Sequence, residues 1–255
     1  MKVALCMSGQ PRFLDECYES ILKNIIEPNN PDIFLHAWSY EDENEPYKYG
    51  GDGGWKKKRI DSNSHEKAIQ LYAPLASKVE PTRKFLMPSV SLKRTFDVYS
   101  PGTEKEAEEA GMTHRDYEKF ILSNNLSMWS SIYESTQMMY HHCLKTGQEY
   151  DAVIRCRFDI NVMTPLIMSQ FDQSYMYAID MSKKYGHISD WLNFSSFENM
   201  MIYGTTFLSY KKIYSDIEKT PNSHPICNEM ALAINLARHG IQCVNLPINV
   251  TLPRF

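Results

Sequence analysis

Apolar runs and amphipathic stretches alternate along the chain and predict alternating strands and helices. Continuous apolar runs bounded by turn residues are typical of parallel strands buried on both faces, and they occur at 3–7, 32–38 and 151–158. Shorter runs predict strands at 77–85, 174–180 and 199–203. Apolar positions three and four residues apart predict helices at 13–26, 65–72, 113–145, 206–218 and 228–239. This alternation predicts an α/β fold with a mostly parallel sheet.

Two local signals refine this picture. The long helix at 113–145 is expected to break near Asn124 and Asn125 and to stop at Gly147. The stretch 39–60 is acidic, then glycine-rich, then basic, with aromatic residues between. Long insertions of this kind in compact domains often bind ligands, so 39–60 is predicted to be a mobile loop over a site.

Composition narrows the classes of function. The chain has 255 residues, of which 43% are hydrophobic, so it can bury a substantial core. The net charge of −4 gives no basic field for extended contact with nucleic acid, and no apolar segment reaches the length of a membrane span. The six cysteines include no CxxC pair, which disfavours a zinc site or a disulfide scaffold. We therefore expect a cytoplasmic protein without nucleic-acid partners.

The turn at 8–12 follows the first predicted strand, where open parallel sheets bind ligands. Backbone N–H groups of Ser8 and Gly9 favour an anion or a carbonyl, and Arg12 can fork onto a phosphate. The sequence has no GxGxxG and no Walker lysine–serine pair, which argues against dinucleotide dehydrogenases and P-loop enzymes. The alternative is an ordinary turn whose serine caps a helix.

Charged residues end the strand predicted at 151–158. Strand alternation places Arg155, Arg157 and Asp159 on one face. Buried together, two guanidiniums and one carboxylate leave a positive charge without a partner, which a bound anion would resolve. A strand end with solvated charges is the alternative.

Other candidate residues lie elsewhere along the chain. Asp190, Trp191 and Asn193 combine a carboxylate, an aromatic ring and an amide, as carbohydrate sites do, although loop anchoring by Trp191 explains them too. Glu229 lies at the start of a predicted helix, where its negative charge interacts favourably with the helix dipole. His36 ends the second predicted strand near the expected mouth of the site, either as a ligand-binding or as a structural residue.

Several of these segments together resemble the GT-A-fold glycosyltransferases. The motifs are SGQPRF, PDIFLHAW, LSMWSSIYES, YDAVIRCRFDI, ISDWLNFSS and NMMIYG, and they extend over most of the chain. Within that fold, the resemblance is to a group found in large DNA viruses and in bacterial surface-polysaccharide clusters. It implies one GT-A-like, Rossmann-related domain over 1–255, with a mixed, mostly parallel sheet flanked by helices. The donor half would be about 1–160 and the acceptor half about 161–255.

The resemblance also implies an activity. The protein would be a hexosyl- or pentosyltransferase that moves a sugar from a nucleoside-diphosphate sugar to a hydroxyl of a glycan or glycoprotein acceptor. A UDP-sugar is favoured and a GDP-sugar is possible. If the protein is viral, it would act in the host cytoplasm. The alternatives are a degenerate transferase that only binds a nucleotide or a carbohydrate, and a sulfotransferase.

The residues that would bind the nucleotide-sugar are Ser8, Gly9, Gln10, Arg12, His36, Arg155, Arg157 and Asp159. Arg157-Phe158-Asp159 occupies the place of the family's Asp-x-Asp signature, so Asp159 is the only carboxylate left in the motif. Either Mn²⁺ or Mg²⁺ is bound through Asp159, or Arg155 or Arg157 neutralises the diphosphate and makes the metal dispensable.

An inverting reaction needs a carboxylate that takes the proton of the acceptor hydroxyl. The resemblance suggests Glu229 for this role, and Asp190 is the competing candidate. A retaining enzyme would not need this base. Trp191 and Asn193 are the candidates for binding the acceptor.

Overall fold

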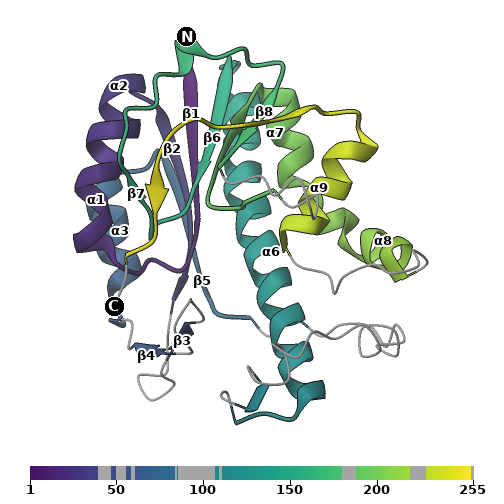
Figure 1. Cartoon of the computed structure of the whole chain (residues 1–255). Helices are drawn as coiled ribbons and strands as arrows, with labels where there is room; N and C mark the ends of the chain where they lie inside the picture. The colour runs from purple at the N-terminus through teal and green to yellow at the C-terminus, as the bar shows by residue number, and fades with distance from the viewer. Residues whose placement is uncertain are drawn as a thin grey trace.

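The computed structural model describes residues 1–39, 47–49, 56–58, 61–83, 85, 107–108, 111–179, 188–218 and 228–253. Within these ranges a seven-stranded sheet forms the centre of the molecule, in the order β10-β8-β9-β6-β1-β2-β5 (Figure 1). The strands are β1 Val3–Gly9, β2 Asp32–Ser39, β5 Ala76–Pro81, β6 Ala152–Cys156, β8 Met176–Ala178, β9 Leu192–Ser195 and β10 Cys243–Asn245. Only β9 runs antiparallel to its neighbours in this sheet.

Helices cover both faces of the sheet (Figure 1). One face carries α1 Leu14–Ile21, the π-helical η1 Leu22–Ile26, α2 Glu27–Asn29 and α3 Ser64–Tyr72. The other face carries α6 His114–Thr146, α7 Phe197–Gly204, α8 Thr206–Glu218 and α9 Asn228–Arg238. This arrangement confirms the predicted α/β fold with a mixed, mostly parallel sheet flanked by helices.

Each central strand contributes to two cores. Alternate residues of β1, such as Leu5 and Met7, belong to the cluster that includes α1 and α3. The residues between them, Ala4 and Cys6, belong to the cluster on the α6 side. Because both faces are covered, both sets of side chains must be apolar, which explains the continuous apolar run.

α6 is a single unbroken helix of 33 residues, so the predicted break near Asn124 and Asn125 is wrong. Thr113 caps its start by accepting a hydrogen bond from the Asp116 N–H, and Gly147 ends it with a φ of 71°. Asparagine lowers helix propensity only modestly, and the packing of the helix against β1 and β2 outweighs that preference.

The strand predicted at 199–203 is also wrong, because this segment is part of α7. The Ser196 side chain accepts a hydrogen bond from the Asn199 N–H and caps the helix. A short apolar run does not distinguish a buried strand from a buried helix. Gly204 allows α7 to approach α6 closely, since a Cβ there would lie 2.7 Å from Thr136.

Smaller elements complete the described part of the chain. β7 Asn161–Val162 pairs with β11 Val250–Thr251, and η2 Met168–Gln170 is a short 3₁₀ turn. In the stretch 39–60, β3 Tyr47–Tyr49 pairs with β4 Lys56–Lys58, while 40–46, 50–55 and 59–60 lie outside the described residues. The mobility of this stretch stays a prediction. Among the described helices, none is both long and apolar enough to cross a bilayer.

Candidate functional site

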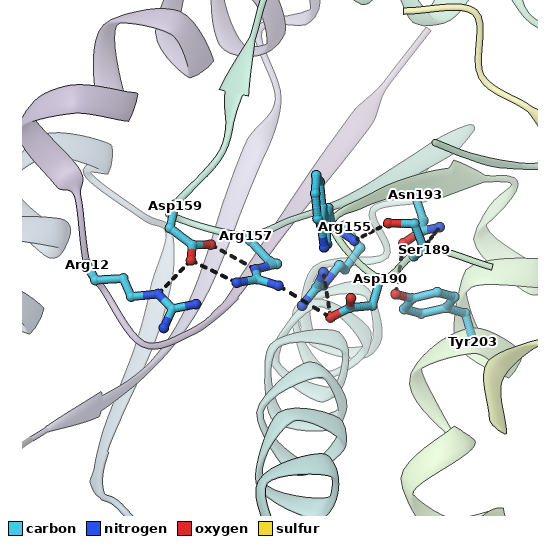
Figure 2. Close-up of polar contacts among 9 residues, drawn as sticks. Arg12, Arg155, Arg157, Asp159, Ser189, Asp190, Asn193 and Tyr203 are labelled. Atoms are coloured by element: carbon cyan, nitrogen blue, oxygen red, sulfur yellow. Dashed lines mark hydrogen bonds and ion pairs between the residues drawn. The ribbon is translucent and has the colours of Figure 1, made fainter. Parts of the chain in front are cut away.

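Five charged side chains form a row at the carboxyl-terminal end of β1 and β6 (Figure 2). Arg12 comes from the turn between β1 and α1, and Arg155 lies in β6. The start of β9 pairs with the end of β6, which brings Asp190 to the same place. We call this set the charged row, in the order Arg12, Asp159, Arg157, Asp190 and Arg155.

Asp159 is tightly held by two arginines. Arg12 Nε donates to Asp159 Oδ2 at 2.6 Å, and Arg157 donates to Oδ1 and Oδ2 at 2.8 Å each. Burial by itself would raise the pKa of Asp159, but Arg12 and Arg157 hold it well below its usual range. Asp159 is therefore ionised at neutral pH, and both of its oxygens already accept hydrogen bonds.

Asp190 is held much more loosely. Its Oδ2 lies 3.9 Å from Arg157 Nη1 and 4.0 Å from Arg155 Nη1, beyond hydrogen-bond distance. Arg155 is almost completely buried, and its Nε and Nη1 have no hydrogen-bond partner within the described structure. These groups are well placed for a ligand, because buried polar atoms are normally hydrogen-bonded.

The charged row holds three guanidiniums and two carboxylates, and Arg12 and Arg157 also make contacts outside the row. Of the arginine side chains, Arg12 and Arg157 are 10% and 19% exposed, whereas Arg155 is 2% exposed. An anion arriving from solvent would therefore meet Arg12 and Arg157 first.

The turn after β1 brings Arg12 into the row. Gly9 has a φ of 121°, a conformation that favours glycine, and the Gln10 carbonyl accepts a hydrogen bond from the Arg12 N–H at 3.0 Å. The residue at the N-cap of α1 is Phe13, so the alternative in which Ser8 caps this helix is wrong. Ser8 Oγ is instead buried with no hydrogen-bond partner in the described part of the chain.

His36 lies outside the charged row. It is fully buried in β2, where its Nδ1 lies 2.6 Å from Ser131 Oγ and its Nε2 lies 3.1 Å from Glu80 Oε2. Burial lowers the pKa of His36, and Glu80 opposes this shift only in part. Because both ring nitrogens are engaged, these contacts favour the structural role for His36 over nucleotide binding.

Asn193 and Trp191 shape the segment that carries Asp190. Asn193 Nδ2 donates to the Ser189 carbonyl at 2.9 Å, and its Oδ1 accepts from the Tyr203 hydroxyl at 3.0 Å (Figure 2). The backbone carbonyl of Trp191 accepts a hydrogen bond from the Arg157 N–H at 3.1 Å. The partly buried side chain of Trp191 packs on the hydrophobic core. These contacts favour a positioning role for Asn193 and the anchoring role for Trp191. Acceptor binding by either residue stays a prediction.

Sequence reasoning missed Ser189 and Tyr203 as parts of this site. Ser189 lies next to Asp190, and nothing in the local pattern predicts that its carbonyl accepts a hydrogen bond from Asn193. Tyr203 lies within the segment that was predicted as a strand, and nothing in the local pattern pairs it with Asn193.

Glu229 lies in the first turn of α9, close to the segment of Asp190. The Ile188 N–H donates to the Glu229 carbonyl at 3.3 Å, which places the first turn of α9 against the residues before β9. The two candidate bases, Asp190 and Glu229, therefore belong to segments that lie next to each other in the fold.

The residues around Asp159 do not fit a divalent metal. Both Asp159 oxygens are occupied by Arg12 and Arg157, and these guanidiniums would repel a cation placed there. Among the described side chains, no group of three or more His, Cys, Asp or Glu is arranged to hold a metal ion. The contacts of Asp159 thus favour the alternative in which arginines meet the diphosphate.

The chain was compared with known protein families, curated sequences and solved structures. No family model and no curated protein sequence matches the chain. The fold is similar to the crystal structure of mouse xyloside xylosyltransferase 1 in its apo form, with 11% identity and a TM-score of 0.42. The match covers 96% of this chain and 84% of that chain. At this identity and score, the likeness assigns no function to the site.

Proposed function

We propose that the protein is a GT-A-type glycosyltransferase that transfers a hexosyl or pentosyl group from a nucleoside-diphosphate sugar to a hydroxyl of a glycan acceptor. The observation that carries this proposal is the charged row, whose three guanidiniums lie beside the turn after the first strand and are held by Asp159 and Asp190. The mixed sheet flanked by helices is the architecture that the sequence resemblance implies. The resemblance alone favours UDP over GDP as the nucleotide.

Arg12 and Arg157 are proposed to bind the diphosphate. Breaking the bond between the anomeric carbon and the diphosphate leaves negative charge on the departing phosphate. Guanidiniums that are already held in place can stabilise this charge without reorganising in the transition state. Asp159 supplies that preorganisation, because its hydrogen bonds fix both arginine side chains. No step of this mechanism passes through a metal ion.

The proton of the acceptor hydroxyl requires a carboxylate if the reaction is inverting. Glu229 and Asp190 are the candidates, and the contact between Ile188 and Glu229 brings their segments together. A retaining reaction would not use this base, and the stereochemistry of the product distinguishes the two outcomes.

A thermal-shift panel of UDP, GDP, CDP and adenosine nucleotides, each with Mn²⁺ and with EDTA, tests the proposal. A ligand that binds only the native state raises the melting temperature. We expect stabilisation by one uridine or guanosine diphosphate under both conditions. Stabilisation by a 3′-phosphoadenosine phosphosulfate analogue alone would favour a sulfotransferase. A nucleotide that binds, but whose sugar is not released in any donor tested, would favour a binding protein without catalysis.

A further inference from the structure

Asp190 is a buried carboxylate that stops short of its two arginine neighbours. Its side chain is 5% exposed, and its Oδ2 lies 3.9 Å from Arg157 Nη1 and 4.0 Å from Arg155 Nη1. Neither distance is a hydrogen bond. The same Arg157 approaches the carboxylate of Asp159 to 2.8 Å, the usual distance for a guanidinium and a carboxylate. Some feature of the structure must therefore hold Asp190 away.

The two guanidiniums are restrained from moving toward Asp190. Arg157 donates through its Nε and Nη2 to Asp159, and its Nη1 is the atom that lies nearest Asp190. The side chain of Arg155 is 2% exposed and belongs to the central strand β6. The width of the gap is therefore set mainly by the position of Asp190.

The amide group of Asn193 fixes the peptide bond that leads into Asp190. Asn193 Nδ2 donates to the Ser189 carbonyl at 2.9 Å, and its Oδ1 accepts from the Tyr203 hydroxyl at 3.0 Å (Figure 2). A carbonyl only accepts, so the contact with Ser189 sets the orientation of the amide and makes Tyr203 the donor to Oδ1. Asn193 and Tyr203 are both fully buried. The planar peptide between Ser189 and Asp190 cannot turn without breaking this chain of hydrogen bonds.

Two backbone hydrogen bonds hold the same segment at its ends. The Ile188 N–H donates to the Glu229 carbonyl at 3.3 Å, and the Arg157 N–H donates to the Trp191 carbonyl at 3.1 Å. Of these contacts and the one from the Asn193 amide, only the last is made by a side chain. A substitution can therefore remove it and leave the other two in place.

We propose that Asn193 and Tyr203 are positioning residues, which hold Asp190 away from the two arginines. Without them, the segment relaxes and Asp190 closes an ion pair with Arg157, the nearer guanidinium. The use of the open arrangement rests on the proposed function. A carboxylate that is not closed onto an arginine can accept a proton or a hydrogen bond from a substrate, and Arg157 keeps its charge for the diphosphate.

Crystal structures of wild type and Asn193→Ala test this role without any ligand. In Asn193→Ala, we expect an oxygen of Asp190 to lie about 2.8 Å from a guanidinium nitrogen, whereas wild type keeps the wider gap. An unchanged gap in the folded variant, or a closed ion pair in wild type, would overturn the positioning role. Tyr203→Phe removes only one hydrogen bond and gives the same readout if Asn193→Ala does not fold.

Asn29→Ala is the matched control. Asn29 also uses both atoms of its amide group, since Nδ2 donates to the Leu166 carbonyl at 2.6 Å and Oδ1 accepts from the Met168 N–H at 2.9 Å. It belongs to α2, on the face of the sheet opposite to α7. Its loss should leave the gap at Asp190 as in wild type.

Calorimetric titration of UDP and GDP with EDTA adds a readout that a loss of structure alone would not produce. We expect Asn193→Ala to weaken nucleotide binding roughly fivefold, because Asp190 then competes with the diphosphate for Arg157. In an Asp190→Asn background the same substitution should have no effect, since an amide forms no ion pair with a guanidinium. Equal weakening in both backgrounds would overturn the positioning role. Binding of neither nucleotide by wild type would overturn the proposed function, while the crystal structures still decide the positioning role.

Discussion

Arg157 donates two hydrogen bonds of 2.8 Å to the carboxylate of Asp159, although only Phe158 separates the two residues in the chain. Arg12 reaches the same carboxylate from a position 147 residues away. The resemblance to GT-A enzymes assigns a metal ligand to this place. In this chain, the carboxylate there organises two cations instead.

Replacing Asp159 by asparagine should destabilise the fold strongly. Removing one partner from a buried, hydrogen-bonded ion pair costs about 3–5 kcal/mol, because the remaining charge is left uncompensated. Urea denaturation of wild type and Asp159→Asn measures the difference. The control is Asp15→Asn, which breaks the exposed pair with Lys67 and should cost less than about 1 kcal/mol. A loss for Asp159→Asn no larger than that of the control would contradict the account of the row.

The hydrogen bonds behind Asp190 should contribute measurably to stability. Asn193→Ala leaves the buried Tyr203 hydroxyl and the Ser189 carbonyl without their partner, and each such group costs about 1–3 kcal/mol. Tyr203→Phe removes one hydrogen bond and should cost about 1 kcal/mol. Tyr133→Phe on the partly exposed face of α6 serves as the control and should be nearly neutral. Equal stability of all three variants would show that the buried chain of hydrogen bonds is unimportant.

Stability should depend on pH through His36. Burial lowers the pKa of His36 in the folded protein, so below about pH 6.5 the unfolded chain binds a proton that the folded chain does not. The free energy of unfolding should therefore fall as the pH drops below that value, by up to about 1.4 kcal/mol per pH unit until the folded protein also takes up the proton. His36→Gln should flatten this slope between pH 7 and 5, measured by urea denaturation at each pH. His239→Gln removes an exposed histidine and should leave the slope as in wild type.

The sequence predicts those parts of the fold whose pattern is set by local burial. The central strands begin and end close to the predicted positions, because β1, β2 and β6 are covered on both faces and consist mostly of apolar residues. Strand alternation also places Arg155, Arg157 and Asp159 together at the end of β6. Because open parallel sheets bind ligands beyond the carboxyl ends of their strands, the sequence also predicts that Arg12 belongs to the site. It does not predict that Arg12 binds Asp159.

The parts of the fold and of the site that the sequence does not predict depend on packing between segments that are distant in the chain. The apolar residues of the segment 197–204 are as compatible with a buried strand as with a helix. The helix is favoured by the cap at Ser196 and by the close contact of Gly204 with α6. The bond between Tyr203 and Asn193 exists only once α7 lies on β9. No local sequence pattern predicts that Arg12 donates a hydrogen bond to Asp159. From the sequence alone, Asp159 could therefore bind either a metal ion or arginine side chains.

Calorimetric titration of UDP and GDP in the presence of EDTA tests the central claim that arginines of the charged row bind the diphosphate. Wild type should bind one of the two nucleotides with an affinity that Mn²⁺ changes little. Arg157→Ala should weaken binding at least tenfold, the effect of about 1.4 kcal/mol, since a charge-assisted contact to phosphate is lost. Lys67→Ala should bind as wild type does. Binding that requires Mn²⁺, or that is unchanged in a folded Arg157→Ala variant, would contradict the account.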